Sequence, residues 1–281
     1  MKWGKVSGLL LAGMLTFGSM SYAESGTPSS AAASSAALAA WQEVSVQTFS
    51  LLDAFERGQG VTTDGTAWIF NSTLGLLRTA LDGQTVLVRN AAAIPLAIAL
   101  KGGDHIGDVS YYDGKIYAPI EDGKNYQHPY IAIYDAKTLK YTGKSYELPL
   151  SLHPGGVPWV AVDAARGQVY TAAWSNATVL NVFSLSDMHL IKTVPLTQSV
   201  DRIQGAEMYN GLLYASSDND TQTVYSIDPD TGAVATAFDR NLPSGTEAQG
   251  IAVLPTADGA ILHILDVGTS RVTINFRGYA Q

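Results

Sequence analysis

Nine polar side chains recur at comparable places in the sequence, each close to the start of a short β-type segment. They are Gln59, His105, Asp108, His153, Arg202, Gln204, Glu207, Glu247 and Gln249. Imidazole, carboxylate, amide and guanidinium groups can together hydrogen-bond a small ligand when a fold brings them into one concavity. We therefore predict a ligand-binding site from these residues, provided that one structural unit repeats around a common centre.

Five of the nine also have the chemistry of metal ligands, and they are His105, Asp108, His153, Glu207 and Glu247. We predict the metal site from the first four. Imidazole and carboxylate groups hold divalent metals, and glutamine oxygens can add to a calcium site. The predicted cofactor is a divalent cation, calcium or zinc, in a central channel. A histidine near a carboxylate can instead act as a general base. Polar side chains that face a water-filled channel need neither role, so all three explanations stay open.

One module of about 50 residues repeats five times after residue 58. Each copy has a polar residue and a glycine at its start, a short strand, a turn that ends in glycine and a second strand. The turn glycines are Gly65, Gly114, Gly167, Gly211 and Gly259, at intervals of 44 to 53 residues. This period is typical of a four-stranded propeller blade. The sequence predicts an all-β fold, a β-propeller of about five four-stranded blades, in which glycine beside glutamine relieves crowding near the axis.

The two ends of the repeating region complement each other. A clear outer strand precedes three of the modules, at residues 144–150, 190–196 and 233–238, and residues 43–51 stand in the same place before the first module. The last module stops after its third strand, at residues 271–276. We predict that strand 43–51 completes the last blade and closes the ring, which removes two exposed strand edges. The alternative is an open β-sandwich with coincidental spacing.

The first residues have the pattern of a secretory signal peptide. Lys2 and Lys5 precede an apolar stretch at 6–20, and Ser21 and Ala23 are small residues at a cleavage site. We predict a signal peptide at 1–23, an Ala/Ser-rich flexible tether at 24–40 and a single β-propeller domain at 41–281. The expected localisation is outside the cytoplasm, either periplasmic or secreted.

The charge balance narrows the range of partners. The chain has 17 basic and 25 acidic residues, a net charge of −8, and no cysteine. Nucleic acids and anionic membranes both favour clustered Lys and Arg, so neither is an expected partner. The expected partner is a small molecule or a protein segment. We expect a monomer without stable membrane insertion after signal cleavage. The absence of cysteine excludes disulfides and thiolate metal sites.

Two other segments have distinctive composition. The stretch 121–130 is a long connection that contains Tyr126, His128 and Tyr130. Long loops on rigid scaffolds often carry binding residues, although a solvated hairpin tip is the simpler explanation. Residues 91–100 are almost entirely apolar and too short to span a membrane, so we predict a buried strand there.

The turn sequences resemble those of the extracytoplasmic propellers described as quinoprotein-like or YncE-like. Tyr225-Ser-Ile-Asp-Pro-Asp-Thr-Gly232 and Ile133-Tyr-Asp-Ala-Lys-Thr138 carry this resemblance. A fainter similarity to plant-type glutaminyl cyclases rests on Gln59-Gly60 with 74–78 after it, on Gln204-Gly205 and on Glu247-Ala-Gln-Gly250. The second resemblance implies a five-bladed propeller with a metal in its channel. The Glu-Gly pairs of that family are replaced here by Gly107-Asp108 and Gln-Gly.

Three classes of function follow. The first is an exported propeller that binds a small ligand, an ion or a protein segment at the polar mouth of its channel. The second is a metal-assisted hydrolase or a cyclase at the same mouth. The third is a structural or protein-interaction module that uses the 121–130 loop. The chain contains no Gly-x-Ser-x-Gly, His-Glu-x-x-His, Walker or Gly-x-Gly-x-x-Gly motif. Whether it is an enzyme stays open.

Overall fold

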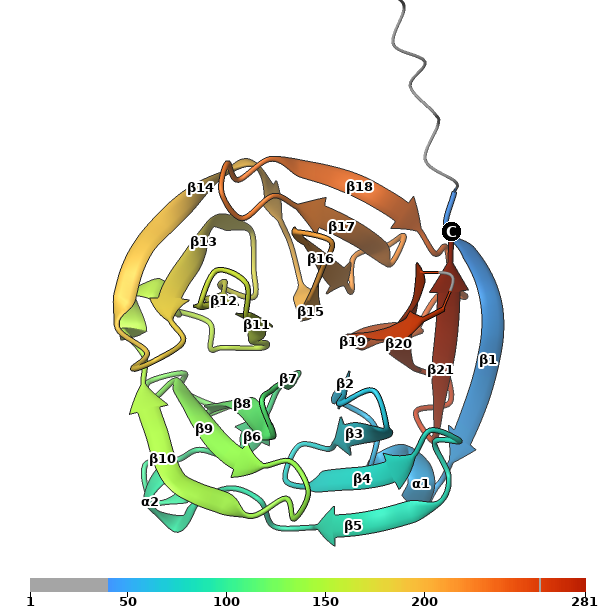
Figure 1. The fold of residues 1–281 in the computed structure, drawn as a ribbon, viewed down its shortest axis with the longest axis horizontal. Coiled ribbons are helices and arrows are strands. Elements are labelled where there is room, and N and C mark those ends of the chain that lie inside the picture. The colour runs from blue at the N-terminus through green and yellow to red at the C-terminus, as the bar shows by residue number, and fades with distance from the viewer. Residues whose placement is uncertain (1–39, 258) are drawn as a thin grey trace, which may run out of the picture. The chain divides into compact units, whose positions relative to one another are not determined.

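Five antiparallel sheets form a ring in the computed structural model, which describes residues 40–257 and 259–281 (Figure 1). The predicted signal peptide and nearly all of the predicted tether lie outside these residues. The ring confirms the predicted all-β propeller of five blades. The two α-helices in the described residues have four residues each and are too short to cross a bilayer.

The blades are numbered from the first complete one, and their strands are given from the axis outward. Blade 1 consists of β2 (Gly60–Thr63), β3 (Ala67–Asn71), β4 (Leu76–Ala80) and β5 (Val86–Asn90). Blade 2 consists of β6 (His105–Ile106) with β7 (Ser110–Tyr112), then β8 (Lys115–Glu121), β9 (Tyr130–Asp135) and β10 (Tyr141–Glu147). Blade 3 consists of β11 (Ala161–Asp163), β12 (Gln168–Thr171), β13 (Ala177–Ser184) and β14 (Leu190–Val200).

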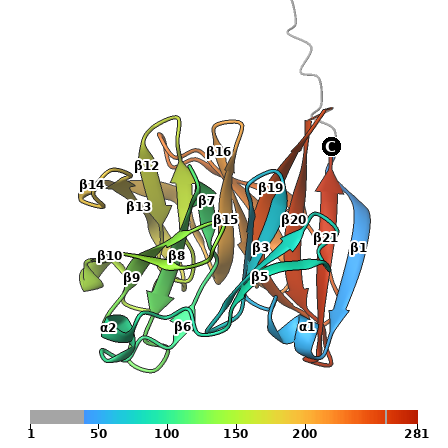
Figure 2. The ribbon, with the colours of Figure 1, turned by 60° about the horizontal axis from the view of Figure 1, so that its bottom comes forward.

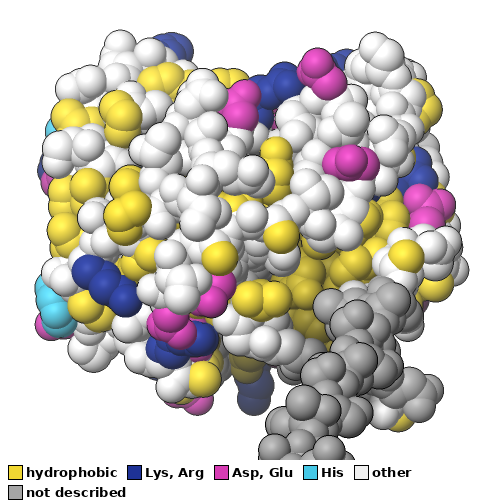
Figure 3. All heavy atoms as spheres, turned by 90° about the horizontal axis from the view of Figure 1, so that it is seen from above, with side chains coloured by type: hydrophobic (Ala, Val, Ile, Leu, Met, Phe, Trp, Pro, Cys, Tyr) yellow, Lys and Arg dark blue, Asp and Glu magenta, His cyan; other side chains and the backbone are white. Residues whose placement is uncertain are grey.

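The last two blades continue the same pattern. Blade 4 consists of β15 (Ile203–Tyr209), β16 (Leu212–Ser217), β17 (Thr223–Ile227) and β18 (Val234–Asp239). Blade 5 consists of β19 (Glu247–Thr256), β20 (Gly259–Val267), β21 (Thr273–Ala280) and β1 (Gln42–Ser50). The outer strand of blade 5 is therefore the first strand of the chain. The outer strands of blades 3 and 4 are seen from outside in Figure 3, where charged side chains lie scattered among uncharged ones.

Ring closure by the first strand is confirmed. β1 pairs antiparallel with β21, and the register runs from Gln42 opposite Ala280 to Ser50 opposite Thr273. Side chains reinforce the pairing, because Arg277 on β21 bonds Glu43 on β1 at 2.8 Å and Asp266 on β20 at 3.0 Å. The pairing leaves neither end of the repeat with an open sheet edge at this junction.

Short helical connectors follow three of the outer strands, and they lie on the face where the inner strands begin. These are α1 (Leu52–Phe55), α2 (Leu96–Ala99) and the 3₁₀ turn η1 (Leu150–Leu152). In Figure 2 this face is the lower one, with α1, α2 and β6 along it. We call it the mouth face. The turn glycines lie at the opposite face.

The predicted buried strand at 91–100 is wrong, because this stretch contains α2. Pro95 lacks an N–H for a strand ladder and instead accepts the Ile98 N–H at 2.9 Å, which opens the helix. Ile98 is buried, whereas Leu96 and Leu100 are 74% and 79% exposed. An unbroken apolar run does not distinguish a buried strand from a short helix with two exposed side chains.

A histidine whose two ring nitrogens are buried lies where the ring closes. His263 on β20 packs between Trp68 of blade 1 and Phe276 of blade 5, with ring centroids 4.7 and 4.8 Å away. Neither ring nitrogen has a hydrogen-bond partner among the described residues. Burial lowers the pKa of His263 to about 4. The unfolded chain therefore binds a proton between about pH 6.5 and 4 that the folded chain does not.

His263→Phe is expected to lessen the loss of stability in acid. The wild-type free energy of unfolding should fall by up to about 3 kcal/mol from this group as the pH drops from 6.5 to 4. The variant lacks the titrating group and keeps the aromatic packing. Urea unfolding of both proteins from pH 4.5 to 7.5 measures the difference. Equal pH dependence in the two proteins would contradict the assignment.

Candidate functional site

The propeller axis is closed at one level by the side chain of Asp108. The inner strand of blade 2 is split into β6 and β7 at this residue, and the Asp108 N–H donates to Pro158 O of blade 3 at 2.9 Å. The buried carboxylate reaches across the axis. Its Oδ1 accepts the Val61 N–H of blade 1 at 2.9 Å, and its Oδ2 accepts the Ile251 N–H of blade 5 at 3.3 Å. Asp108 thus connects four blades through their backbones.

Glycines surround this carboxylate because the inner strands leave no space for side chains. A Cβ on Gly60 would lie 2.7 Å from the Asp108 Cα. A Cβ on Gly205 would lie 2.6 Å from the Gly250 Cα, and one on Gly250 would lie 2.6 Å from the Gly60 Cα. Real Cβ atoms do not approach other atoms so closely. The glycines beside Gln59, Gln204 and Gln249 therefore serve close packing at the axis.

A cleft of about 460 Å³ opens on the mouth face, and we call it the His105 cleft. Residues from blades 1 to 4 line it, and they are Thr73, Asp104, His105, Glu121, Gly123, Lys124, Tyr126, Gly155, Pro158, Trp174 and Gln204. Two half-buried aromatic side chains, Tyr126 and Trp174, share the lining with hydrogen-bonding groups. The lining holds two carboxylates, Asp104 and Glu121, and the ammonium group of Lys124, together with the His105 imidazole. The cleft thus combines apolar surface with polar groups of no strong net charge.

His105 stands at the centre of a hydrogen-bonded array in this cleft. Its Nδ1 lies 2.9 Å from Glu121 Oε1, and its Nε2 lies 2.8 Å from Gln59 Oε1. The other oxygen of Glu121 accepts the Val157 N–H at 2.6 Å. The His105 side chain is 27% exposed and that of Glu121 is 8% exposed. The array therefore fixes an imidazole at the cleft surface, with a buried carboxylate behind it.

The loop 121–130 contributes one of the aromatic walls. Tyr126 has a φ of 53°, in the left-handed region that non-glycine residues rarely adopt. Its ring packs against Gly156, where an added Cβ would lie 2.8 Å from the ring carbon Cδ1. Strained backbone of this kind often occurs at binding sites. The two other residues singled out in this loop lie elsewhere: His128 and Tyr130 both bond Glu147, each at 2.7 Å.

The structure separates the remaining predicted residues from this cleft. His153 is fully buried, with Nδ1 3.0 Å from Pro149 O and Nε2 2.8 Å from Thr171 Oγ1, and burial lowers its pKa. Glu207 lies farther along β15, beyond the level of Asp108. Burial raises the pKa of Glu207 to about 8 and that of Asp108 well above its ordinary value.

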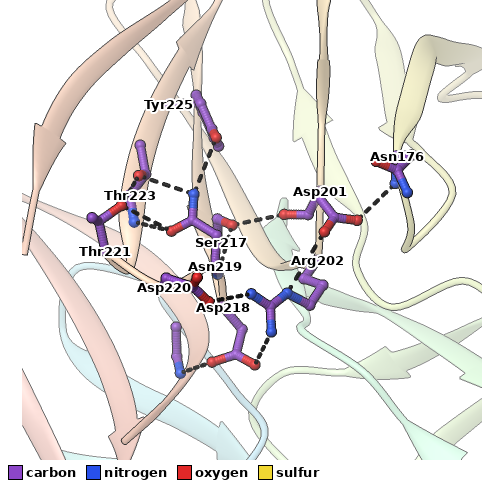
Figure 4. Close-up of polar contacts among 11 residues, drawn as sticks. Asn176, Asp201, Arg202, Ser217, Asp218, Asn219, Asp220, Thr221, Thr223 and Tyr225 are labelled. Atoms are coloured by element: carbon purple, nitrogen blue, oxygen red, sulfur yellow. Dashed lines mark hydrogen bonds and ion pairs between the residues drawn. The ribbon is translucent and has the colours of Figure 1, made fainter. Parts of the chain in front are cut away.

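Arg202 and Glu247 line a second, polar cleft of about 360 Å³ between blades 4 and 5, whereas Gln249 is buried. Figure 4 shows Arg202 among three aspartates, with ion-pair distances of 3.7 Å to Asp201, 4.0 Å to Asp218 and 3.3 Å to Asp220. Gln249 donates to Glu247 at 2.9 Å, and Glu247 pairs with Arg271. The nine predicted residues thus divide among separate surface clefts, the axis and the buried interior.

The four predicted metal ligands do not form one ligand set. His105 faces the cleft, His153 lies in the interior, and both oxygens of Asp108 accept backbone N–H groups. Within residues 40–257 and 259–281, no group of three or more His, Cys, Asp or Glu side chains is placed to hold a metal ion. The residues present therefore do not fit the divalent cation that the sequence suggested.

The comparison with protein families adds an independent result. The family described as a repeat of unknown function, DUF6923, matches residues 109–253, which run from blade 2 to the inner strand of blade 5. This match covers more than half of the chain. The chain belongs to this family. The propeller fold together with a repeat family suggests that the chain is a binding or interaction module. The finer resemblance to quinoprotein-like and YncE-like propellers stays a prediction.

Two further comparisons concern curated proteins and solved structures. No curated protein matches it. Among solved structures, a chain in the crystal structure of the mitotic checkpoint complex is similar, with 12% identity, a TM-score of 0.46 and coverage of 78% of this chain and 73% of that one. A function has to be argued from the site itself.

Asp104, Glu121 and Trp174 are among the lining residues of the His105 cleft that were not singled out in the sequence. Asp104 directly precedes His105, while Glu121 and Trp174 lie at or just after the ends of the second strands of blades 2 and 3. Second strands run antiparallel to inner strands, so their ends return to the mouth face. The positions at and just after the end of each second strand could therefore have indicated these lining residues.

Proposed function

We propose that the chain binds a small, neutral, polyhydroxylated molecule, such as a sugar, in the His105 cleft. The observation that carries the proposal is the combination of Tyr126 and Trp174 with His105, Glu121 and Gln204 around about 460 Å³ of space. The C–H face of a sugar ring packs on aromatic side chains, and its hydroxyl groups both donate and accept hydrogen bonds. A cleft that holds both acidic and basic groups and has little net charge favours a neutral ligand over an ion.

The volume also agrees with such a ligand. Sites for small molecules usually enclose about 300–1,000 Å³ and place a few polar groups among apolar ones. The Glu121 carboxylate and the Gln59 amide hold the His105 ring in one orientation, so little conformational entropy is lost when a ligand binds it. Export from the cytoplasm, which residues 1–23 predict, would place this cleft in contact with extracytoplasmic sugars.

His105→Ala is expected to weaken binding of methyl β-D-glucoside at least tenfold, about 1.4 kcal/mol. The variant removes the fixed imidazole ring from the cleft wall and leaves Glu121 and Gln59 without their shared partner. NMR titration that follows the Trp174 indole N–H measures the affinity and reports on the cleft directly. Trp174→Phe identifies that signal.

A matched control is His189→Ala. His189 is an exposed histidine that also bonds a carboxylate, Asp187 Oδ1 at 2.6 Å, but it does not line the cleft. The control should bind the glucoside as the wild type does. The proposal fails if the Trp174 signal of the wild type does not move at millimolar glucoside, or if both alanine variants bind equally.

A further inference from the structure

An apolar groove of about 340 Å³ lies beside the His105 cleft on the mouth face. It is formed between blades 5 and 1, and its lining includes Leu51, Phe55 and Val272, which are 73%, 62% and 50% exposed. Ala54 and Ile274 form its buried part. Large apolar side chains that are exposed around a concavity usually mark a binding surface. Within residues 40–257 and 259–281, these three side chains stay exposed.

The groove and the cleft are continuous. Thr73 lines both of them. Gln59 lines the groove, and its Oε1 lies 2.8 Å from Nε2 of His105, which lines the cleft. A molecule bound against His105 can therefore extend past Gln59 and Thr73 into apolar surroundings without leaving the protein surface.

The backbone at Leu51 is held in an unusual conformation that keeps its side chain at the groove. Its φ of 55° lies in the left-handed region, which is unfavourable for leucine. The Leu51 N–H donates to Val272 O at 2.9 Å and ties the two sides of the groove together. A strained residue with an exposed apolar side chain contributes little to the core, so its placement is better explained by a bound partner.

We propose that the ligand of this face is a small amphiphile, with a sugar-like head in the His105 cleft and an aliphatic chain in the groove lined by Leu51, Phe55 and Val272. The inference rests on the proposed function, because the head group is the molecule proposed above. It adds the chemical class of the remainder of the ligand. The chain is held by burial of apolar surface, and its affinity increases with the number of CH₂ groups that the groove covers.

The experiment compares methyl and octyl β-D-glucoside, the second below its micelle concentration, by the same NMR titration. Octyl glucoside is expected to bind at least tenfold more tightly than methyl glucoside, since burial of two CH₂ groups suffices for that factor. His105→Ala is expected to lower the affinity for both glucosides by a similar factor, because both carry the same head group.

Two neighbouring leucines provide a matched pair of variants. Leu51→Asp places a charge in the groove at a position whose φ of 55° and ψ of −120° are unfavourable for leucine and aspartate alike. Leu52 is almost equally exposed, at 70%, but it lines a different groove of about 180 Å³. Leu51→Asp should remove the advantage of the octyl chain and leave methyl glucoside binding unchanged. Leu52→Asp should preserve that advantage.

The results distinguish this inference from the proposed function. If methyl glucoside binds in a His105-dependent way but the octyl chain adds nothing, the amphiphile inference is wrong and the proposed function stands. Equal losses in Leu51→Asp and Leu52→Asp would show a nonspecific apolar surface and also overturn the inference. If neither glucoside binds, both proposals fail.

Discussion

Gly250→Ala is expected to lower the free energy of unfolding by about 3 kcal/mol or more, which is the upper range for overpacking. The added Cβ would lie 2.6 Å from the Gly60 Cα and would also contact the Asp108 carboxylate. At Gly60 the added Cβ meets the backbone of another blade, and backbone, unlike a side chain, cannot rotate away. Relief would require blades 1 and 5 to separate, and β1 and α1 hold them close on the outer side.

Gly155→Ala is the matched control for this variant. Gly155 also lies on the mouth face, but its added Cβ would meet no atom within 4 Å, and its φ is not positive. Urea unfolding followed by tryptophan fluorescence should give a midpoint near that of the wild type for Gly155→Ala and a much lower one for Gly250→Ala. Similar midpoints for the two variants would show that the inner strands are not in close contact.

The sequence predicted the blade count and the closure of the ring because both depend on local signals. Turn glycines such as Gly114 and Gly211 have positive φ values, so they mark a backbone requirement that only few residues meet. Strand 43–51 could be assigned to the last blade because each blade needs an outer strand and that blade lacked one. Glycine beside Gln59 and Gln249 was correctly connected with crowding at the axis.

The details of the site could not be predicted in the same way. Asp108 and His105 are three residues apart, yet one closes the axis and the other faces the cleft, because the inner strand of blade 2 breaks between them. His153 precedes its inner strand by several residues, so its side chain enters the interior and not the mouth. Such outcomes depend on contacts between blades. A repeat pattern places residues on a blade but does not give the direction of each side chain.

Asp108→Ala is expected to cost about 4 kcal/mol of stability. The variant leaves the Val61 and Ile251 N–H groups buried without their acceptor, and an unmet buried donor costs about 1–3 kcal/mol. It also opens a void where four blades meet. Urea unfolding measures the loss, and Asp108→Asn should lie between the alanine variant and the wild type, since the amide keeps one oxygen. A loss below about 1 kcal/mol would contradict a bridging role.

A double-mutant cycle with Gly250→Ala tests whether the carboxylate and the glycines form one packed unit. Without the Asp108 side chain, the methyl group that Gly250→Ala adds gains part of the space that the carboxylate filled, while its contact with the Gly60 backbone persists. The double variant should therefore be less destabilised than the sum of the single variants by about 1 kcal/mol or more, as residues in direct contact usually are. Strict additivity would mean that the two positions act independently. In that case the glycines would be required by strand spacing alone, and the carboxylate would serve only as an acceptor for backbone N–H groups.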